Sequence, residues 1–494
     1  MTKADNNTST STKVAKGMST QTSITIMLGV LEIISFSIMS RLLTDKDFGY
    51  YAAILAVVTV FQSFAETGIG SAIIQRKEFD RYYVNNSFSM SLIIGVVVTL
   101  ALFLSANFVA RIVADESMTI PLRIISVTLL FNCLSSINIS ILQRNLHFLK
   151  IGIINVISFV VTTIIAIVLA ANGYGYYAII TKGVLASILI LILSQIIVGI
   201  KYKFVFDIIV YKQIFGFGGW LMAAAIFRNI AAQVDRLLMT SLFSVQILGL
   251  YTRPKEFIST IAGRFNTIFD TVLFPILSSL QDDKEKLQNS FISGCYLLNL
   301  FAMVLSLLFY CNSELLIRIF FGEKWLHIDI LFKVLSFYPV LLVNGRIGDI
   351  FLRSIALTKQ QFCFRVGQLA FAFIFILSCY KAGIVAVAIS VMASYASITT
   401  IKVLYITRKM GLSNHLMFRS MIQSYRFTLY IIPLYIVCHV LLPNTWEGNI
   451  IQSLAVTISF LVLFVFFPNV VGKKYKEAGY SLVAKFVKSK IFKK

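Results

Sequence analysis

Residues 150–171 read KIGIINVISFVVTTIIAIVLAA, an apolar run whose one charged residue, Lys150, stands at its beginning. A helix needs roughly 20 predominantly apolar residues to cross the hydrocarbon core of a bilayer, so this stretch predicts a membrane-spanning helix. Comparable runs lie near 20–42, 49–72, 86–110, 119–142, 176–199, 215–243, 246–278, 288–311, 327–352, 363–380, 384–406, 421–442 and 449–467. The sequence therefore predicts an all-α polytopic membrane protein with about 14 transmembrane helices, twelve being the alternative count.

The composition agrees with a membrane protein. Of the 494 residues, 58% are hydrophobic and 13% are charged, whereas soluble domains carry about 25% charged residues. The net charge is +22, and the basic residues fall between the apolar runs, which favours the lipid bilayer over nucleic acid as the partner. The six cysteines are scattered without a CxxC pair. We therefore expect no metal site, and the absence of nucleotide-binding and hydrolase motifs predicts no enzyme and no cofactor.

Lysine and arginine residues are concentrated in every second connection between the apolar runs. They gather at 76–81, 144–150, 201–212 and 284–286, at Arg353, Lys359 and Arg365, at 408–419 and in the tail at 473–494. The alternate connections hold far fewer, namely Arg41, Lys46, Arg111, Arg318, Lys324 and Lys381. Under the positive-inside rule this alternation predicts cytoplasmic N- and C-termini and an even number of spans.

Short echoes within the chain predict two homologous halves related by an axis along the membrane normal. Three segment pairs recur at offsets of roughly 200 to 210 residues: Phe48–Tyr51 with Leu248–Tyr251, Leu142–Arg144 with Phe351–Arg353, and Gly175–Ala178 with Gly383–Ala386. The predicted organisation is a polar cytoplasmic tail at 1–19, six-helix bundles at 20–200 and 201–410, two further spans at 411–468, and a basic cytoplasmic tail at 469–494.

Charged residues inside the apolar runs are the candidate functional residues, because a charge at mid-bilayer is costly and usually faces a bundle interior or a hydrated cavity. The candidates for binding an anionic substrate through guanidinium groups are Arg228, Arg236, Arg264 and Arg346. Glu32, Asp235 and Asp349 are candidates either for coupling to H⁺ or Na⁺ or for structural ion pairs.

Helical spacing groups these charges. Arg228 and Asp235 are seven residues apart and share one face, whereas Arg236 is turned by about 100° from Asp235. Arg346, Asp349 and Arg353 follow an i, i+3, i+7 pattern that predicts a polar stripe along one helix. Most of these residues fall in the second half, so we expect an asymmetric cavity whose cations come from the second bundle.

Several motifs, in this order and spacing, resemble those of Wzx-type polysaccharide flippases, particularly the branch that includes the colanic acid exporter. They are Phe48–Tyr51, Thr67–Glu78, Leu142–Phe148, Phe215–Leu221, Asp235–Arg236, Leu248–Tyr251, Leu273–Asp283 and Phe321–Trp325. The resemblance runs from about residue 17 to about residue 410. The family belongs to the multidrug/oligosaccharidyl-lipid/polysaccharide exporter superfamily, which implies a V-shaped pair of six-helix bundles around a central cavity.

The resemblance also implies a function and a place in the cell. The expected substrate is an oligosaccharide repeat unit on undecaprenyl diphosphate, moved across the bacterial plasma membrane for exopolysaccharide, capsule or O-antigen synthesis. A polysaccharide polymerase and co-polymerase are further candidate partners. The expected energy source is H⁺ or Na⁺ coupling or the membrane potential. The alternative is an ion-coupled, drug-type antiporter of the same superfamily, which would be expected to line its cavity with acidic or aromatic side chains.

Overall fold

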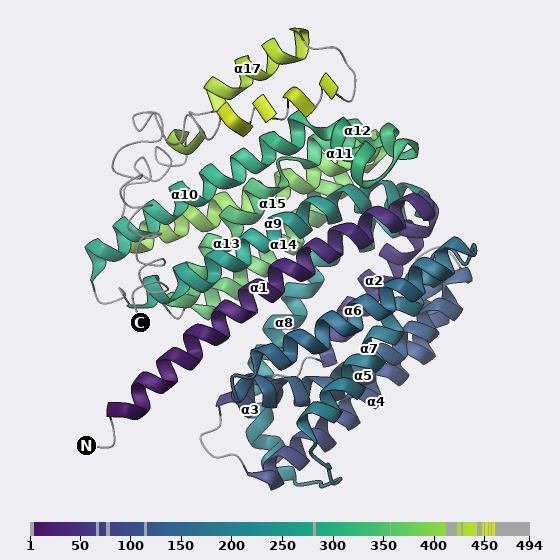
Figure 1. Ribbon diagram of the computed structural model, residues 1–494, viewed down its shortest axis with the longest axis vertical. Helices are drawn as coiled ribbons and strands as arrows, with labels where there is room; N and C mark the ends of the chain where they lie inside the picture. Colours follow the sequence, from purple (N-terminus) through teal and green to yellow (C-terminus); the bar gives the residue numbers. More distant parts are fainter. Residues whose placement is uncertain are drawn as a thin grey trace. The chain divides into compact units, whose positions relative to one another are not determined.

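The chain is an assembly of long helices, drawn as ribbons in Figure 1. The computed structural model describes residues 4–65, 69–75, 80–112, 116–279, 283–355 and 357–411, and short pieces between 422 and 459. The predicted basic tail at 469–494 lies outside the described residues. Within those residues, ten helices are long and apolar enough to cross a membrane. The prediction of an all-α, multi-pass membrane protein is confirmed, and the total of 14 spans stays a prediction.

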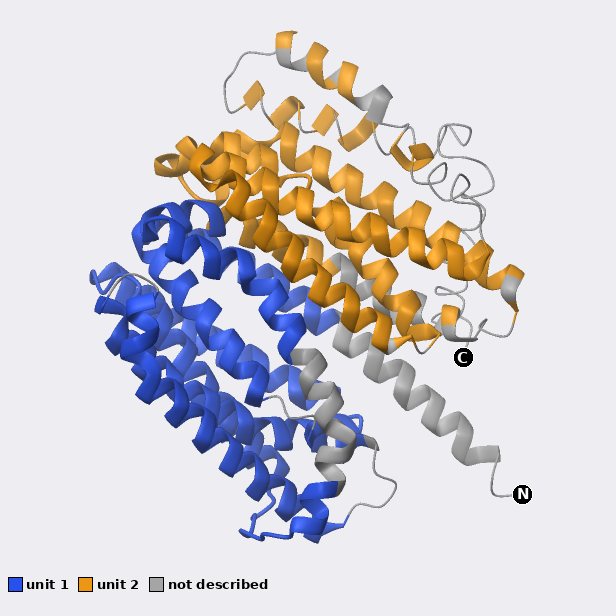
Figure 2. Cartoon of the chain, turned by 180° about the vertical axis from the view of Figure 1, so that it is seen from behind, with its two compact units in different colours: residues 1–252 blue, residues 253–494 orange. Residues whose placement is uncertain are grey.

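Two compact units make up the chain, residues 1–252 and residues 253–494, coloured separately in Figure 2. Unit 1 contains α1 (Ala4–Leu42), α2 (Asp45–Ala65), α3 (Ile69–Gln75), α4 (Arg81–Ile112), the 3-10 turn η1 (Glu116–Met118), α5 (Thr119–Arg144), α6 (Phe148–Ala171), α7 (Tyr177–Val198) and α8 (Ile208–Leu242). Helix α9 (Val245–Ser279) begins in unit 1 and continues into unit 2. The predicted bundle limits follow the sequence repeat rather than contacts, and they stay a prediction.

Unit 2 continues with α10 (Lys284–Cys311), α11 (Ser313–Phe320), η2 (Glu323–Ile328), α12 (Asp329–Leu335), α13 (Tyr338–Ser354), α14 (Thr358–Cys379), η3 (Tyr380–Ala382), α15 (Ile384–Met410) and α17 (Thr428–Leu441). The span predicted at 327–352 is interrupted, because α12 ends at Leu335 and α13 restarts at Tyr338. Pro339 lies in the first turn of α13, where proline's missing N–H costs no helical hydrogen bond.

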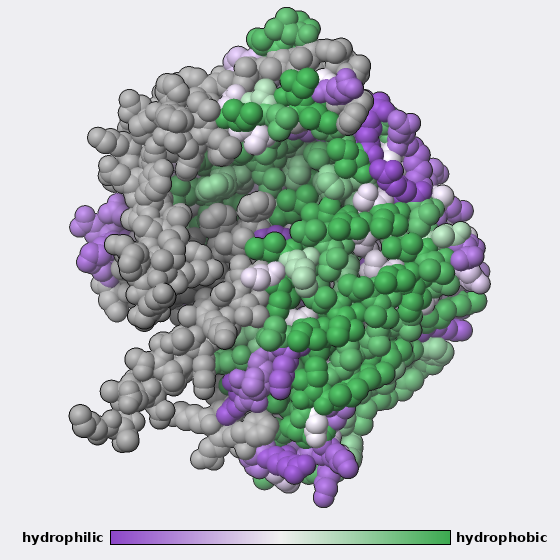
Figure 3. Space-filling model, in the orientation of Figure 1, coloured by the Kyte–Doolittle hydropathy of each residue, from purple (hydrophilic) through white to green (hydrophobic). Residues whose placement is uncertain are grey.

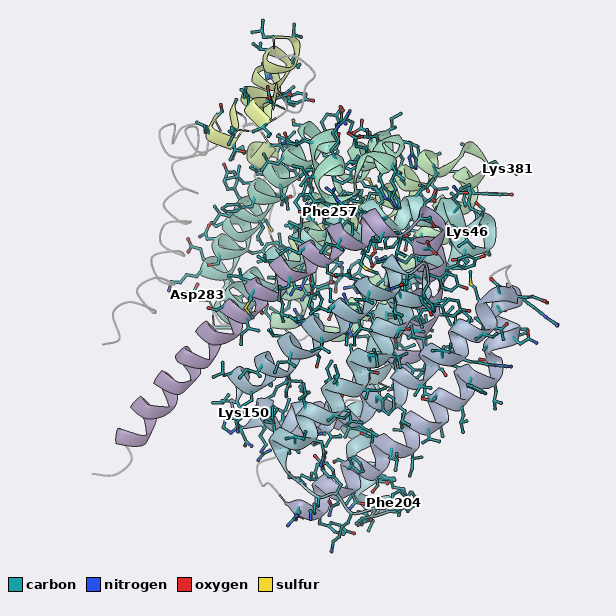
Figure 4. The ribbon with its side chains drawn as sticks, turned by 45° about the vertical axis from the view of Figure 1, so that its right-hand side comes forward. Lys46, Lys150, Phe204, Phe257, Asp283 and Lys381 are labelled. Carbon is teal, nitrogen blue, oxygen red and sulfur yellow. The ribbon has the colours of Figure 1, made fainter. Side chains whose placement is uncertain are left out.

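Residues from alternate connections lie at opposite ends of each unit. Figure 4 shows Lys46, from the lysine-poor connections, at the opposite end of unit 1 from Lys150 and Phe204. In unit 2 it likewise shows Lys381 and Asp283 at opposite ends. Hydrophobic side chains cover the face formed by α6 and α7, and hydrophilic ones gather toward its ends (Figure 3). This is the surface expected of helices that satisfy their own backbone hydrogen bonds in lipid.

The sequence echoes fall at corresponding helix ends. The repeated segment that contains Gly49 lies in the first turns of α2, and its counterpart that contains Gly249 lies in the first turns of α9. The repeated segments that end in Arg144 and Arg353 lie in the last turns of α5 and α13. The repeated segments that begin with Gly175 and Gly383 lie at the starts of α7 and α15. Gly175 and Gly383, which stand at those last two starts, both have positive φ angles, of 55° and 95°. Glycine adopts this left-handed region without a Cβ penalty, which accounts for its recurrence.

The motif Leu142–Phe148 is explained by the tight turn between α5 and α6. The N–H of His147 donates to the Leu142 carbonyl at 2.9 Å and the N–H of Leu146 to the Gln143 carbonyl at 3.0 Å. This pattern is a Schellman ending, with Leu146 rather than glycine at φ 57°. Arg144 donates to the Ile73 carbonyl at 2.7 Å, which places a cation against the C-terminal carbonyls of α3.

A pair of glycines lets α2 and α9 cross at backbone contact. A Cβ added at Gly49 would lie 1.8 Å from the carbonyl oxygen of Val245, and one at Gly249 would lie 1.9 Å from that of Asp45. Each glycine meets the residue four positions before the other, so the crossing is symmetric about the two repeats. Small residues that permit close approach are the usual means by which membrane helices associate.

Gly49→Ala and Gly249→Ala are each expected to destabilise the protein, because the clash is with backbone that no side-chain rotation relieves. Overpacking of this kind costs about 1–3 kcal/mol or more. The matched control is Gly183→Ala in α7, where an added Cβ meets nothing within 4 Å and helix propensity favours alanine by about 0.8–1.0 kcal/mol. Thermal unfolding midpoints in detergent check this. Equal midpoints for the three variants would contradict the assigned crossing.

Candidate functional site

Asp235 is a buried acid held by the next helix. It lies on α8 with 3% of its surface exposed, and its carboxylate accepts a hydrogen bond from the Tyr251 hydroxyl on α9 at 2.7 Å. The neighbouring Arg236 is half-buried, and its guanidinium donates to Gln233 at 3.3 Å. The two adjacent charges therefore have different partners, as the predicted 100° turn between them requires.

Arg228, predicted to share a face with Asp235, differs from it in burial. Arg228 is exposed, and its Nε lies 3.5 Å from the side-chain oxygen of Asn229. The Asn229 amide donates to Ser63 at 3.0 Å and so connects α8 to α2. Along α8, the polar face thus runs from a buried acid to an exposed guanidinium that can reach an anion.

Unit 1 also holds Lys182, a cation within a predicted membrane span that was not among the predicted site residues. Lys182 lies in α7, its ammonium donates to Ser35 on α1 at 3.0 Å, and it stands 4.4 Å from the centroid of the Phe159 ring on α6. The half-buried Glu32 lies one turn before Ser35 on the same face of α1. A lone lysine in the predicted span 176–199 was the available signal.

The expectation that the substrate-binding cations come from the second bundle, residues 201–410, stays a prediction. Lys182, Arg228 and Arg236 all lie within residues 1–252, which form unit 1. Arg264 and Arg346 lie in unit 2. Because α8 packs in unit 1 rather than with the second half of the sequence, both units supply guanidinium groups.

In unit 2, Asp349 is the centre of a three-helix ion cluster. Asp349 on α13 is 4% exposed and Lys402 on α15 is also 4% exposed. The Lys402 ammonium lies 2.8 Å from one Asp349 carboxylate oxygen, and Arg365 on α14 pairs with the other oxygen. Lys402 also donates to the Gly345 carbonyl at 3.3 Å, and Arg365 donates to Gln368 at 3.0 Å. We refer to Asp349, Arg365 and Lys402 as the ion cluster.

The ion cluster changes two expectations. Arg365 was predicted to lie in a connection, but it lies within α14, where it reaches the buried Asp349 carboxylate. The predicted stripe is also split, because Asp349 is buried whereas Arg346 and Arg353 on the same helix are exposed. Asp349 therefore holds helices together, and the two arginines face outward from α13.

Other charged and amide side chains of unit 2 differ in how deeply they are buried. Arg264 on α9 is half-buried. Arg253 on the same helix is 6% exposed and lies 3.6 Å from Glu256. Between α10 and α13, Asn299 and Asn344 exchange two amide hydrogen bonds, of 2.9 and 2.6 Å. Such paired amides fix one helix register within an apolar core.

The described residues supply four guanidinium groups that differ in exposure. Arg228 and Arg346 are exposed, and Arg236 and Arg264 are half-buried. Guanidinium groups bind phosphate or carboxylate through paired N–H donors. No group of three or more His, Cys, Asp or Glu side chains that could hold a metal ion occurs within the described part of the chain.

Comparison with known proteins gives matches at the level of sequence and of fold. The profile of the family described as "Polysaccharide biosynthesis protein" matches residues 38–330. The teichuronic acid biosynthesis protein TuaB of Bacillus subtilis (strain 168) is 23% identical over 332 residues, which are 65% of this chain and 66% of TuaB. The lipopolysaccharide biosynthesis protein WzxC of Escherichia coli (strain K12) is 24% identical over 307 residues, 61% and 62% of the two chains. The chain thus spans less than two thirds of the length of these relatives.

Two solved structures share the fold. The lipid II flippase MurJ in an inward closed conformation superposes with a TM-score of 0.67 at 17% identity, covering 91% of this chain and 98% of MurJ. An inward-facing multidrug resistance MATE family transporter of the MOP superfamily superposes with a TM-score of 0.63 at 14% identity, covering 79% and 98%. These likenesses confirm the fold class that the sequence predicted.

Proposed function

Because the chain belongs to the polysaccharide biosynthesis protein family, we propose that it moves an undecaprenyl-diphosphate-linked oligosaccharide repeat unit from the inner to the outer leaflet of a bacterial plasma membrane. The observation that carries this proposal is the combination of the family match with the fold of a lipid II flippase. TuaB is described as a teichuronic acid biosynthesis protein and WzxC as a lipopolysaccharide biosynthesis protein. The proposed class is a transporter rather than an enzyme.

The charges of the described residues suit a diphosphate head group. Within each unit taken by itself, guanidinium groups are candidates to replace water around a phosphate: Arg228 and Arg236 in unit 1, and Arg264 and Arg346 in unit 2. The acids Asp235 and Asp349 accept hydrogen bonds from protein groups, Asp235 from the Tyr251 hydroxyl and Asp349 from the Lys402 ammonium. Removing phosphate negative charge from a cytoplasm at negative potential is favoured by about 2.3 kcal/mol per charge per 100 mV.

After releasing the substrate, the carrier must return to its inward-facing state, and this step needs a driving force. Glu32 and Asp235 are our candidates for taking up H⁺ or Na⁺ while the empty carrier resets, and the membrane potential is the alternative driving force. The lysine-rich connections support cytoplasmic termini. A polymerase and co-polymerase would use the exported repeat unit at the outer leaflet.

Deletion of the gene in the producing bacterium tests this function. The expected result is loss of the surface polysaccharide together with accumulation of the lipid-linked repeat unit inside, both reversed by a plasmid copy. Drug sensitivity should stay unchanged. Normal polysaccharide combined with new sensitivity to cationic drugs would instead identify the antiporter alternative, and it would overturn the flippase proposal.

A further inference from the structure

Residues 199–207, here called the linker segment, connect α7 to α8 without forming a helix. Three alternate backbone N–H groups of the linker segment donate to side chains at the start of α4. Lys203 donates to Asn85 at 3.2 Å, Val205 to Ser89 at 2.9 Å and Asp207 to Asn86 at 2.9 Å. Alternate amides of an extended chain point the same way. The linker segment is therefore bound along α4 like a strand paired with side chains.

Both ends of the linker segment are fixed as well. Near its start, the Tyr202 ring stacks on Phe88 with centroids 4.2 Å apart, and its hydroxyl donates to Asn138. At its end, Asp207 caps α8 by accepting the Ile209 N–H at 2.8 Å, and it accepts the Tyr82 hydroxyl at 2.9 Å. The Ile209 N–H and the Tyr82 hydroxyl lower the Asp207 pKa, so this cap is intact at neutral pH and is lost only as pH falls through that lowered pKa.

The outer side of this fixed segment carries large apolar side chains. Their exposed fractions are 63% for Phe204, 60% for Phe206, 55% for Ile208 and 64% for Ile209. Lys201, Lys203 and Lys212 are exposed among them. Because the amides of residues 203, 205 and 207 are bound to α4, Phe204 and Phe206 between them cannot turn inward without breaking those hydrogen bonds.

The position of the linker segment identifies the surface it meets. It follows the last turn of α7 and lies beside the first turns of α4, two spanning helices, so it stands where both leave the bilayer. Figure 4 shows Phe204 at that end of unit 1. The exposed apolar surface continues onto α7 through Ile196, which is 71% exposed. Aromatic and aliphatic side chains with interspersed lysines are typical of segments lying in an anionic membrane surface.

We propose that the linker segment and the first turn of α8 together form an interfacial anchor. It inserts Phe204 and Phe206 of the linker segment and Ile208 and Ile209 of α8 among lipid head groups, and it sets Lys201, Lys203 and Lys212 against anionic phosphates. The occupant of this surface is phospholipid of the leaflet at this end of the helices. The anchor holds the start of α8 at a fixed depth, because Asp207 joins the linker segment to that helix.

Depth measurement by spin labelling tests the anchor. A nitroxide is attached to Phe204→Cys in a cysteine-free, full-length background, in vesicles of phosphatidylcholine alone or with phosphatidylglycerol. Collision with oxygen, which concentrates in lipid, is compared with collision with a water-soluble nickel complex. We expect oxygen contact to dominate at position 204 and to increase further with phosphatidylglycerol. The control label at Glu323→Cys, whose side chain is 80% exposed, should contact the nickel complex.

The lysines are tested separately. The triple variant Lys201→Gln, Lys203→Gln and Lys212→Gln retains the linker hydrogen bond at position 203, which is made by backbone. It is expected to abolish the difference between the two vesicle types. Nickel contact at position 204 equal to that at position 323 in anionic vesicles would overturn the anchor. So would an unchanged phosphatidylglycerol response in the triple variant. Since neither readout involves transport, failure of the anchor is distinguishable from failure of the proposed function.

Discussion

An Asp349→Asn variant is expected to unfold far more readily than the parent protein. The substitution keeps the shape of the side chain but leaves two cations, Lys402 and Arg365, packed together with no anion between them. Breaking a buried ion pair by removing one partner typically costs about 3–5 kcal/mol. The expected observation is a large drop in the thermal unfolding midpoint in detergent and a low yield of monodisperse protein.

Companion variants separate charge from packing. Lys402→Met should cost less, because Asp349 retains Arg365, and the double variant Asp349→Asn/Lys402→Met should recover part of the stability lost by Asp349→Asn alone. The matched control is Glu314→Gln. Glu314 is exposed and pairs with the half-buried Arg318, and pairs near the surface contribute about 0–1 kcal/mol. An Asp349→Asn protein that is as stable as the control would show that the ion cluster does not hold α13, α14 and α15 together.

The second large effect concerns transport rather than stability. Arg228→Gln, Arg264→Gln and Arg346→Gln are each expected to reduce export of the lipid-linked repeat unit by about tenfold or more, since a hydrogen bond to a charged group contributes about 1.5–3 kcal/mol and 1.4 kcal/mol is tenfold. Lysine at these positions should restore export only in part, because it lacks the planar, two-pronged donor geometry. The readout is surface polysaccharide, normalised to the amount of protein in the membrane.

Arg353→Gln is the matched control for Arg346→Gln. Both arginines lie on α13 and both are exposed, but Arg353 is in the last turn, at the helix end. We expect normal protein levels in both variants and a marked export defect only in Arg346→Gln. Equal export in the three test variants and the control, at equal protein levels, would remove the guanidinium groups from the account of substrate binding.

Local sequence pattern was sufficient for the helices. The apolar run at 150–171 corresponds to α6 at Phe148–Ala171, and the run at 176–199 corresponds to α7 at Tyr177–Val198. The apolar run determines the element, because a helix satisfies its own backbone within lipid. The repeat was also visible in the matching segments around Gly49 and Gly249. The contact between these two segments could not be predicted from the sequence, because helix crossing depends on tertiary packing.

The charged residues show where the sequence was insufficient. Periodicity placed Asp349 beside Arg346 and Arg353 on one helix, but its partners Arg365 and Lys402 come from two other helices. A single sequence carries no information on such pairing. Lys182 and Lys402 were each a lone lysine within an apolar run, which was a usable signal. The linker segment was predicted only as a connection. Its hydrogen bonds depend on Asn85, Asn86 and Ser89 of α4, which lie more than a hundred residues earlier in the sequence.

Translocation by the purified protein tests the central claim most directly. Undecaprenyl diphosphate bearing the oligosaccharide repeat unit is placed in one leaflet of vesicles containing the full-length protein, and a membrane-impermeant glycosidase reports how much remains outside. We expect the protein to move the glycolipid out of reach of the glycosidase. We also expect that Arg346→Gln slows this movement and that Arg353→Gln does not. Movement no faster than in protein-free vesicles, with folded protein present, would contradict the account.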